Sequence, residues 1–167
     1  MSHPARHRAV VITCSTRAAA GEYEDRSGPL AVAGLRELGL ACDDPVVVPD
    51  GAPVGEALRA AIAEGADLVV TTGGTGLAPT DRTPEETGPL LDRQLPALAA
   101  AIVTHGVAGG VPTAVLGRGL AGLAGRTLVV NLPGSRGGVR DGLAVLGPVL
   151  GHALDQVRGG DHPGGNA

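Results

Sequence analysis

Apolar residues along this chain form two alternating patterns: short apolar-rich runs, and stretches in which apolar residues return every three or four positions. The short runs, typical of strands covered on both faces, are residues 9–14, 42–48, 67–70, 111–116 and 126–130. The helical spacing predicts helices over residues 27–40, 54–63, 85–91, 95–105 and 134–157. Strands that alternate with helices favour parallel pairing through right-handed crossovers. We therefore predict a three-layer α/β/α sandwich around a mostly parallel sheet.

The length of 167 residues suits one domain with a single core. We expect this domain to span residues 9–158, between a flexible N-terminus at residues 1–8 and a disordered, glycine-rich tail at residues 159–167. The polar start has no apolar region of a signal peptide, and no stretch approaches the ~20 apolar residues of a membrane span. These features predict a cytoplasmic protein with no membrane partner.

The composition argues against nucleic acid as a partner. The formal net charge is −4, and the chain has no Trp or Phe and one Tyr, so it lacks both a basic surface and aromatic stacking platforms. Cys14 and Cys42 have neither the spacing of a zinc site nor that of a CxxC redox pair. We interpret them as two reduced thiols packed in strands.

The most informative motif follows the run at residues 67–70. Residues 71–76 read TTGGTG, so backbone amides and hydroxyls stand at a strand end with little side-chain bulk over them, as in sites that bind phosphate. Asp81 follows in a turn-rich stretch. Thr83 is the expected N-cap of a short helix, with Pro84 in its first position and Glu86 three residues after the cap. The segment thus predicts a phosphate cradle beside a carboxylate that could hold a metal ion.

Other candidate residues stand at the ends of neighbouring predicted strands. Ser15 follows the first strand, Asp50 follows the second, and residues 131–135 form a small-residue turn that leads to a helix with Ser135 as its expected N-cap. In parallel α/β sheets the ligand lies at the C-terminal ends of the strands. Two anion sites at this edge suggest a pair of ligands.

The same residues also fit simpler roles. Asp50 suits a turn before Gly51, and Ser135 suits a helix cap alone. Glu85 and Glu86 suit the first turn of a helix, where acids favour the helix dipole. The glycines could merely permit a tight turn. Arg118 fits phosphate binding and a subunit contact equally well.

Residues 71–76, Asp81 and the run Thr83-Pro84-Glu85 together resemble the signature of the molybdopterin adenylyltransferase family, of the MogA/MoaB type. Further segments that resemble the family are residues 15–29, 48–50, 113–118, 121–122 and 131–135, so the similarity spans roughly residues 9–157. The resemblance implies the family's fold and reaction. In that reaction Mg²⁺ and ATP serve to transfer an adenylyl group to the terminal phosphate of molybdopterin, with release of pyrophosphate.

The resemblance also implies roles for individual residues. The residues expected for catalysis and for Mg²⁺ are Asp50 and Asp81. Those expected for nucleotide phosphate are Thr72, Gly73, Gly74, Thr75, Gly76 and Glu85. Those expected for molybdopterin are Ser15, Asn131, Pro133, Gly134, Ser135 and Arg136. The family also implies a homo-oligomer, a trimer or a dimer of trimers, with residues 117–125 as a possible subunit contact and a molybdate-insertion protein as a further partner.

The chain departs from the family pattern at three places. Thr16 stands where the family usually has Asp, Arg136-Gly137-Gly138 replaces a frequent Pro-Lys, and Gly117 replaces a frequent Ser. A second hypothesis is therefore a non-catalytic carrier or scaffold that binds molybdopterin or a precursor. A dinucleotide-binding domain is disfavoured because the first strand leads to CSTR rather than to G-x-G-x-x-G. The sequence leaves open whether a molybdenum or a tungsten pathway is served.

Overall fold

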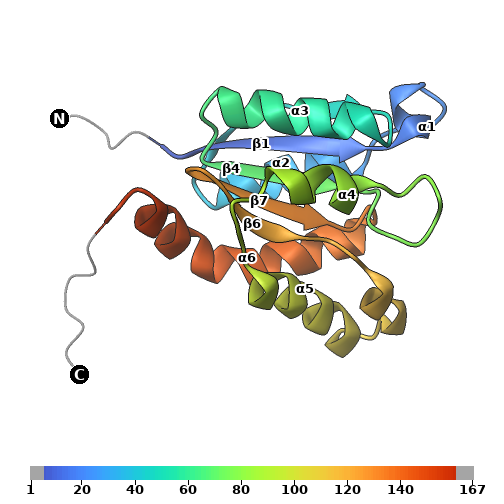
Figure 1. The fold of residues 1–167 in the computed structure, drawn as a ribbon. Coiled ribbons are helices and arrows are strands. Elements are labelled where there is room, and N and C mark those ends of the chain that lie inside the picture. The colour runs from blue at the N-terminus through green and yellow to red at the C-terminus, as the bar shows by residue number, and fades with distance from the viewer. Residues whose placement is uncertain (1–5, 161–167) are drawn as a thin grey trace.

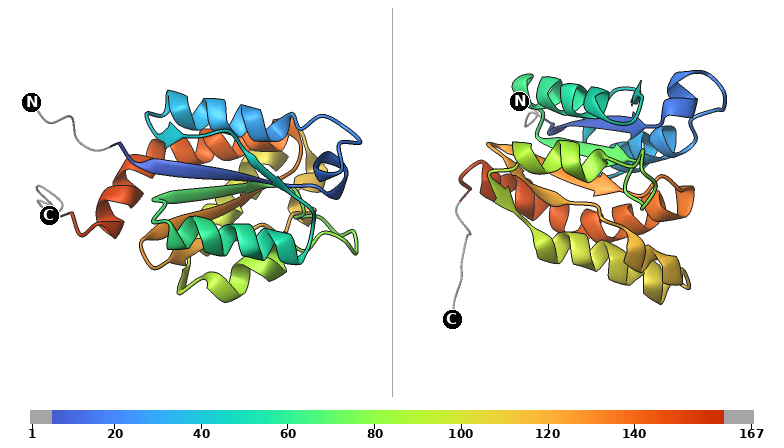
Figure 2. Two further views of the ribbon diagram at one scale, coloured as in Figure 1. Left: turned by 90° about the horizontal axis from the view of Figure 1, so that it is seen from above. Right: turned by 45° about the vertical axis from the view of Figure 1, so that its right-hand side comes forward.

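A sheet of seven strands lies between two layers of helices in the computed structural model, which describes residues 6–160 (Figure 1). The layers are clearest from above (Figure 2, left). This arrangement confirms the predicted α/β/α sandwich. The expected flexible N-terminus and disordered tail fall mainly on residues 1–5 and 161–167, which lie outside the described residues.

The sheet is parallel in its larger part. Its order is β2-β1-β4-β7-β6-β5, with β3 also paired to β1. The strands are β1 (Arg8–Cys14), β2 (Ala41–Cys42), β3 (Val46–Val48), β4 (Leu68–Thr72), β5 (Arg93–Gln94), β6 (Ala121–Ala124) and β7 (Thr127–Leu132). All pairs among β1, β2, β3, β4 and β7 are parallel, whereas β6 and β5 are antiparallel to their neighbours. A mostly parallel sheet was the prediction.

Helices cover both faces of this sheet. One face carries α2 (Ser27–Glu37), α5 (Pro96–Ala108) and α6 (Arg136–Val157). The other face carries α3 (Ala52–Ala63) and α4 (Thr83–Thr87) with the 3-10 turn η1 (Gly88–Leu90). The short helix α1 (Thr16–Ala19) follows β1, where a loop was expected. Within residues 6–160, none of these helices is long and apolar enough to cross a membrane.

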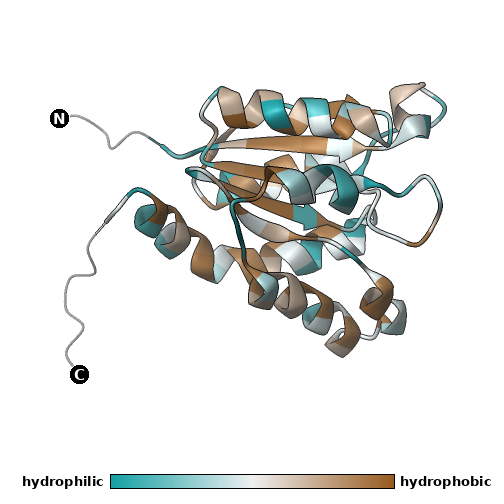
Figure 3. Cartoon of the chain, in the orientation of Figure 1, coloured by the Kyte–Doolittle hydropathy of each residue, from teal (hydrophilic) through white to brown (hydrophobic). Residues whose placement is uncertain are grey.

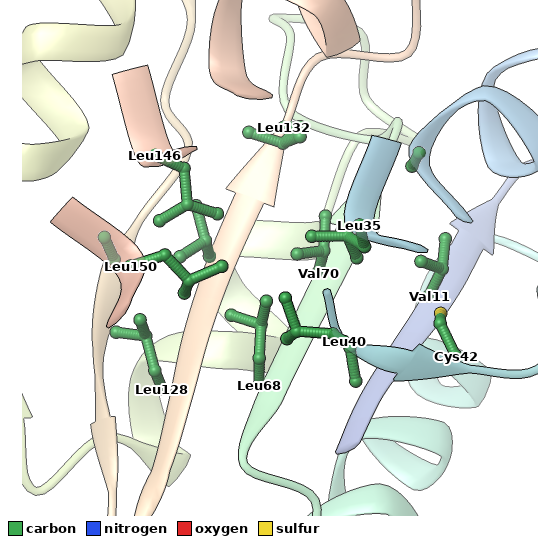
Figure 4. Packing of buried hydrophobic residues seen from close by; sticks show 14 of the residues in the cluster. Val11, Leu35, Leu40, Cys42, Leu68, Val70, Leu128, Leu132, Leu146 and Leu150 are labelled. Atoms are coloured by element: carbon green, nitrogen blue, oxygen red, sulfur yellow. The ribbon is translucent and has the colours of Figure 1, made fainter. Parts of the chain in front are cut away.

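The buried strands divide their side chains between two apolar clusters. On β4, Leu68 and Val70 pack toward α2 and α6, whereas Val69 packs toward α3. This alternation is the ordinary period of a strand. In Figure 4, Leu35 lies beside Val70, and Leu146 lies beside Leu150, all within the first cluster. The strands accordingly show the brown of apolar residues in Figure 3.

Two predicted strands differ in the structure. Residues 42–48 are split into β2 and β3 because Pro45, which has no amide hydrogen, interrupts the ladder. Residues 111–116 are not a strand but contain the 3-10 helix η2 (Pro112–Leu116), and Val115 and Leu116 are exposed. The segment 117–125, where no strand was predicted, holds the buried strand β6 (Ala121–Ala124). These corrections do not alter the order of the central strands.

Asp67, just before β4, joins the first strand to the last helix. Its carboxylate accepts hydrogen bonds from Arg8 N (2.7 Å) and from the Arg158 guanidinium (2.7 Å). Burial alone would raise the pKa of Asp67. The hydrogen bonds from Arg8 and Arg158, with the charges of Arg158 and His7, outweigh burial and lower this pKa below its ordinary value.

We therefore expect Asp67→Asn to lower the free energy of unfolding by about 1 kcal/mol at pH 7. Because the folded pKa is depressed, the carboxylate stabilises the fold in full above the unfolded pKa of about 3.9, and this contribution is lost as the pH falls through the lower folded value. Urea unfolding of both proteins at pH 7 and pH 3 measures the effect. A deficit that stays constant between the two pH values would contradict it.

Candidate functional site

Three central strands end together at one edge of the sheet. In the parallel register Thr13 lies opposite Thr72, and Thr72 lies opposite Leu132. The next residues remain adjacent, since Gly73 N donates to Leu132 O (3.1 Å) and a Cβ on Gly134 would lie 3.2 Å from Gly73 Cα. The glycine loop and the turn before α6 are therefore back to back.

The glycine loop requires its glycines. Gly73 and Gly74 have φ values of +95° and +67°, the left-handed region that side chains rarely adopt. A Cβ on Gly73 would lie 2.5 Å from Cys14 O, and one on Gly74 would collide with the Thr83 hydroxyl. We expect any substitution at Gly73 to distort the loop.

The loop leaves backbone donors without acceptors. Among the described residues, no acceptor is bonded to the amides of Gly74, Thr75 and Gly76. The loop is fixed from its other side, because the Thr83 hydroxyl donates to Gly73 O (3.0 Å) and Thr83 N donates to Gly74 O (3.0 Å). Consecutive free amides on a rigid loop form an anion site.

Thr83 was expected as the N-cap of α4, and this prediction is wrong. Thr83 is the first residue of the helix, and Arg82 takes the cap position without a side-chain hydrogen bond. The Thr83 hydroxyl serves the glycine loop instead. Pro84 was expected in the first position of the helix and is its second residue, still within the first turn.

Asp50 lies beside the glycine loop and is oriented by Thr16. Asp50 Oδ2 accepts from Thr16 N (3.0 Å) and from the Thr16 hydroxyl (2.9 Å). Asp50 Oδ1 has no protein partner among the described residues and lies 3.2 Å from the position of a Cβ on Gly74. The residue that replaces the usual Asp thus holds the neighbouring carboxylate in place.

Asp81 lies at the far end of the loop that follows β4, which projects beyond the strand ends (Figure 1). Asp81 Oδ2 accepts from Ala78 N (3.1 Å) and would lie 2.7 Å from a Cβ on Gly76. No described residue donates to its Oδ1. Asp50 and Asp81 therefore flank the glycine loop, each with one available carboxylate oxygen.

Arg118 clamps this loop from outside. Its Nε donates to Gly76 O (2.9 Å), its Nη2 donates to Asp81 O (2.8 Å), and its Nη1 pairs with the Glu85 carboxylate. The hydrogen bond from Arg118 lowers the pKa of Glu85. These contacts fix the position of Asp81. They correspond neither to phosphate binding nor to a subunit contact, the two roles that the sequence left open for Arg118. The carboxylate of Glu85 is engaged in the same clamp.

A cavity of about 480 Å³ opens beside the loop. Of the predicted site residues, those that line it are Gly73, Gly74, Thr75, Gly76, Asp81, Asn131, Pro133, Gly134 and Ser135. Those that do not line it are Ser15, Asp50, Thr72, Glu85 and Arg136. The opposite wall comes from α5 and η2 and includes Ile102, Ala114 and Leu116. Although residues 113–118 resemble the family, no residue of this wall was predicted as part of the site, because its side chains are apolar or small.

The turn before α6 presents a second set of donors to the cavity. Ser135 is the N-cap of α6, as predicted, and its hydroxyl accepts from Gly138 N (3.0 Å). The first amides of a helix lack intrahelical acceptors and attract anions. Ser15 plays the corresponding role for α1, since its hydroxyl accepts from Ala18 N (3.1 Å).

Asn131 is buried, and its side chain is occupied by structural hydrogen bonds. Its Nδ2 donates to the hydroxyls of Thr71 (3.0 Å) and Thr87 (3.1 Å), and its Oδ1 accepts from Leu120 N (3.0 Å). Thr72 is occupied as well, because its hydroxyl donates to Pro133 O (2.8 Å). These two side chains shape the site rather than offer free donors to it.

A magnesium ion fits the donor set at the loop, although residues 6–160 contain no group of three or more His, Cys, Asp or Glu side chains that could hold a metal by themselves. Mg²⁺ is commonly bound by one or two carboxylates together with substrate phosphates and water. The free oxygens of Asp50 and Asp81 match that pattern. Neither carboxylate is neutralised by an Arg or Lys side chain in the described residues.

Both cysteines are free and buried in strands, as predicted. Burial raises the pKa of Cys14 to about 12, which the nearby Asp50 also favours and a hydrogen bond with Thr83 opposes. Cys14 is therefore a neutral thiol at pH 7 and packs beneath the loop.

Comparisons with known proteins agree with this geometry. Residues 10–152 match the family model described as "Probable molybdopterin binding domain". The solved structure of the molybdopterin biosynthesis Mog protein from Mycobacterium ulcerans is 53% identical with a TM-score of 0.86, over 90% of this chain and 99% of that chain. The molybdopterin adenylyltransferase of Pyrococcus furiosus is 40% identical over 152 residues, which are 89% of each protein.

A longer relative matches as well. The molybdenum cofactor biosynthesis bifunctional protein of Chlorobaculum tepidum is 35% identical over 161 residues, which are 96% of this chain and 50% of that protein. The chain thus spans about half the length of this bifunctional relative. The region shared by all three proteins includes the glycine loop and the turn before α6.

Proposed function

This chain belongs to the molybdopterin-binding family of molybdenum cofactor biosynthesis proteins, and we propose that it transfers the adenylyl group of Mg-ATP to molybdopterin. One observation carries the proposal: two anion sites, the glycine loop and the α6 N-terminus, lie back to back at one sheet edge between two carboxylates. A reaction that joins two phosphorylated molecules needs such a pair of sites. The cytoplasmic location expected from the sequence is part of this proposal.

The chemistry asks for positioning more than for a base. An oxygen of the terminal phosphate of molybdopterin attacks the α-phosphorus of ATP, and the new P–O bond forms as the bond to the bridging oxygen of the β-phosphate breaks. Pyrophosphate leaves with that electron pair. The attacking oxygen is already anionic at neutral pH. The free amides of Gly74, Thr75 and Gly76 would bind nucleotide phosphate, and the α6 N-terminus would bind the phosphate of molybdopterin.

Mg²⁺ bound by Asp50 and Asp81 would neutralise charge on the α-phosphate and on the leaving pyrophosphate. The protein's own part is to hold the two carboxylates apart and in position. Thr16 does so for Asp50, and the turn at Ala78 together with Arg118 does so for Asp81.

The decisive experiment incubates the purified protein with molybdopterin and Mg-ATP and follows both adenylylated pterin and pyrophosphate by chromatography. We expect both products in equal amounts, and neither after EDTA removes the metal. The departures at Thr16 and Gly137 favour one competing function, that of a carrier. Pterin binding without any pyrophosphate would establish the carrier and refute the transferase.

The exposed apolar residues at the end of α5 and on η2 support the proposal of a homo-oligomer, a trimer or a dimer of trimers. They are Val107, Val111, Val115 and Leu116. Residues 121–124 of the expected contact segment 117–125 are buried in β6 and would not contribute to such a contact. Sedimentation of the protein would give the stoichiometry. A molybdate-insertion protein is the further partner that this function requires.

Gly137 offers a test of the molybdopterin side of the cavity. It lines the cavity in the first turn of α6, and a Cβ added there meets no protein atom within 4 Å. We expect Gly137→Ala to stabilise the helix by up to about 1 kcal/mol and to weaken molybdopterin binding about tenfold, roughly 1.4 kcal/mol, by filling space that the ligand needs. Calorimetry and thermal unfolding measure the two effects.

The matched control is Gly151→Ala. Gly151 lies on the same helix, also has no protein atom within 4 Å of an added Cβ, and does not line the cavity. It should share the stabilisation and leave binding unchanged. If Gly137→Ala and Gly151→Ala bind molybdopterin with equal affinity, the ligand does not contact the cavity wall at Gly137.

A further inference from the structure

A second carboxylate, Asp141, faces the cavity from α6. Asp141 lies on the helix face that includes Gly137 and Gly138, four and three residues earlier, and all three residues line the cavity. From the first residue of α6 to Asp141 the helix rises by about 7.5 Å. Asp141 therefore lies about one and a half turns further along α6 than the anion site at Ser135 and lines the same cavity.

The carboxylate of Asp141 is held from one side. Its Oδ1 lies 3.2 Å from His105 Nδ1 on α5, and its Oδ2 lies 3.6 Å from the position of a Cβ on Gly106, which also lines the cavity. The side chain of Asp141 is 27% exposed. The contact with His105 fixes the carboxylate, while the missing side chain of Gly106 leaves access to it.

The charge of Asp141 is out of place in a cavity that only binds phosphate. Among the described lining residues, Asp81 and Asp141 are the only ionisable side chains, and no Arg or Lys lines the cavity. A carboxylate accepts hydrogen bonds and repels anions. Other lining residues, among them Ile102, Val103 and Ala114, are apolar. The cavity thus suits a ligand with a phosphate at one end, a flat body, and N–H donors at the other end.

From this arrangement we propose that Asp141 recognises the 2-amino-4-oxopyrimidine edge of the pterin ring and so determines the specificity of the site. The inference rests on the proposed function, because it assigns the orientation of molybdopterin in the same cavity. The pyrimidine edge of a pterin carries two adjacent donors, N3–H and the 2-amino group. A carboxylate accepts both in a bidentate pair, and such charge-assisted bonds are the stronger kind. His105 acts as a positioning residue through Asp141.

The test compares Asp141→Asn with the native protein. An amide presents one acceptor and one donor, so it loses one bond and opposes a ligand N–H with its own. We expect the KM for molybdopterin to rise at least tenfold, the KM for ATP to stay within twofold, and kcat at saturating molybdopterin to change little.

Binding of two simple ligands provides a readout that a structural role would not alter. The probes are 6-hydroxymethylpterin and the corresponding lumazine, in which an oxo group replaces the 2-amino group. The native protein should prefer the pterin about tenfold, and Asp141→Asn should lose this preference. His105→Gln removes the imidazole that positions Asp141 but keeps the carboxylate, so it should weaken the preference only in part.

The outcomes separate the two proposals. If native protein adenylylates molybdopterin and Asp141→Asn keeps both its KM and the preference for pterin, Asp141 has no part in recognition and the inference fails alone. If His105→Gln loses the preference as fully as Asp141→Asn does, the contact between the helices explains the effect and the inference also fails. If the native protein neither adenylylates nor binds molybdopterin, the proposed function itself fails.

Discussion

Replacing Asp81 by Asn should reduce the kcat for adenylylation about 10³-fold while molybdopterin still binds. The amide can accept the hydrogen bond from Ala78 N that Oδ2 accepts now, and Arg118 bonds the backbone carbonyl rather than the carboxylate. The loop should therefore keep its shape. The variant lacks the negative charge that we assign to Mg²⁺, and a metal ion of this kind supplies several kcal/mol of transition-state stabilisation. Each 1.4 kcal/mol corresponds to a factor of ten in rate.

Two measurements make this expectation specific. The concentration of Mg²⁺ that gives half-maximal rate should rise for Asp81→Asn. The KM for molybdopterin should stay within about threefold, because Asp81 is not expected to contact molybdopterin in the ground state. Asp43→Asn, an exposed substitution between β2 and β3, is the control and should behave as the native protein. An unchanged rate of adenylylation in Asp81→Asn would exclude this carboxylate from catalysis. Asp50 would then be the single carboxylate assigned to Mg²⁺.

The parts of the fold that the sequence predicted are those in which local pattern and burial coincide. The strands β1, β4 and β7 are covered on both faces, so each reads as an apolar run. The strand β6 was missed because its four residues, AGLA, carry no β-branched side chain. Its extended form depends on pairing with β7. Residues 111–116 were wrongly predicted as a strand: they contain a 3-10 helix, and their large apolar side chains, Val111, Val115 and Leu116, are exposed rather than buried.

In the candidate site, too, some residues could be predicted from the sequence and others could not. Motif and strand-end position were enough to predict the glycine loop and Asp81, because backbone conformation at such a loop demands particular residue types. The same signals could not predict the apolar wall from α5 or the role of Arg118, because these depend on segments that meet only in the folded chain. Asp141 could not be predicted for a further reason: an acid between Arg140 and Gly142 in a helix resembles an ordinary surface position.

The second large effect should be on stability, at Asn131. We expect Asn131→Leu, a change that keeps the number and branching of the side-chain heavy atoms, to lower the free energy of unfolding by about 3 kcal/mol. The apolar side chain leaves the partly buried Leu120 N without its acceptor and removes the donor shared by the buried hydroxyls of Thr71 and Thr87. Each unsatisfied buried group costs about 1–3 kcal/mol. Thermal unfolding should show a Tm lower by about 6–12 °C for a chain of this size.

A matched control lies on the same strand. Thr127 is buried at the opposite end of β7, and its hydroxyl makes one hydrogen bond, to Ala66 O (2.6 Å). Thr127→Val should cost about 1 kcal/mol and leave adenylylation unchanged. If Asn131→Leu costs no more than this control, its three hydrogen bonds do not support the fold as the structure implies.

The consequence for activity separates the two roles of Asn131. Leu120 follows the segment that carries Arg118, and Arg118 fixes the carbonyl groups of Gly76 and Asp81. Loss of the bond at Leu120 should therefore loosen the clamp and lower kcat by about tenfold, with a smaller change in the KM for molybdopterin. Direct binding of the pterin by Asn131, as the family resemblance implied, predicts the reverse: a higher KM, an unchanged kcat and a fold of normal stability. Measuring kcat and KM below the Tm of the variant distinguishes the two roles. A lower kcat indicates support of the Arg118 clamp, and a higher KM indicates direct binding of the pterin.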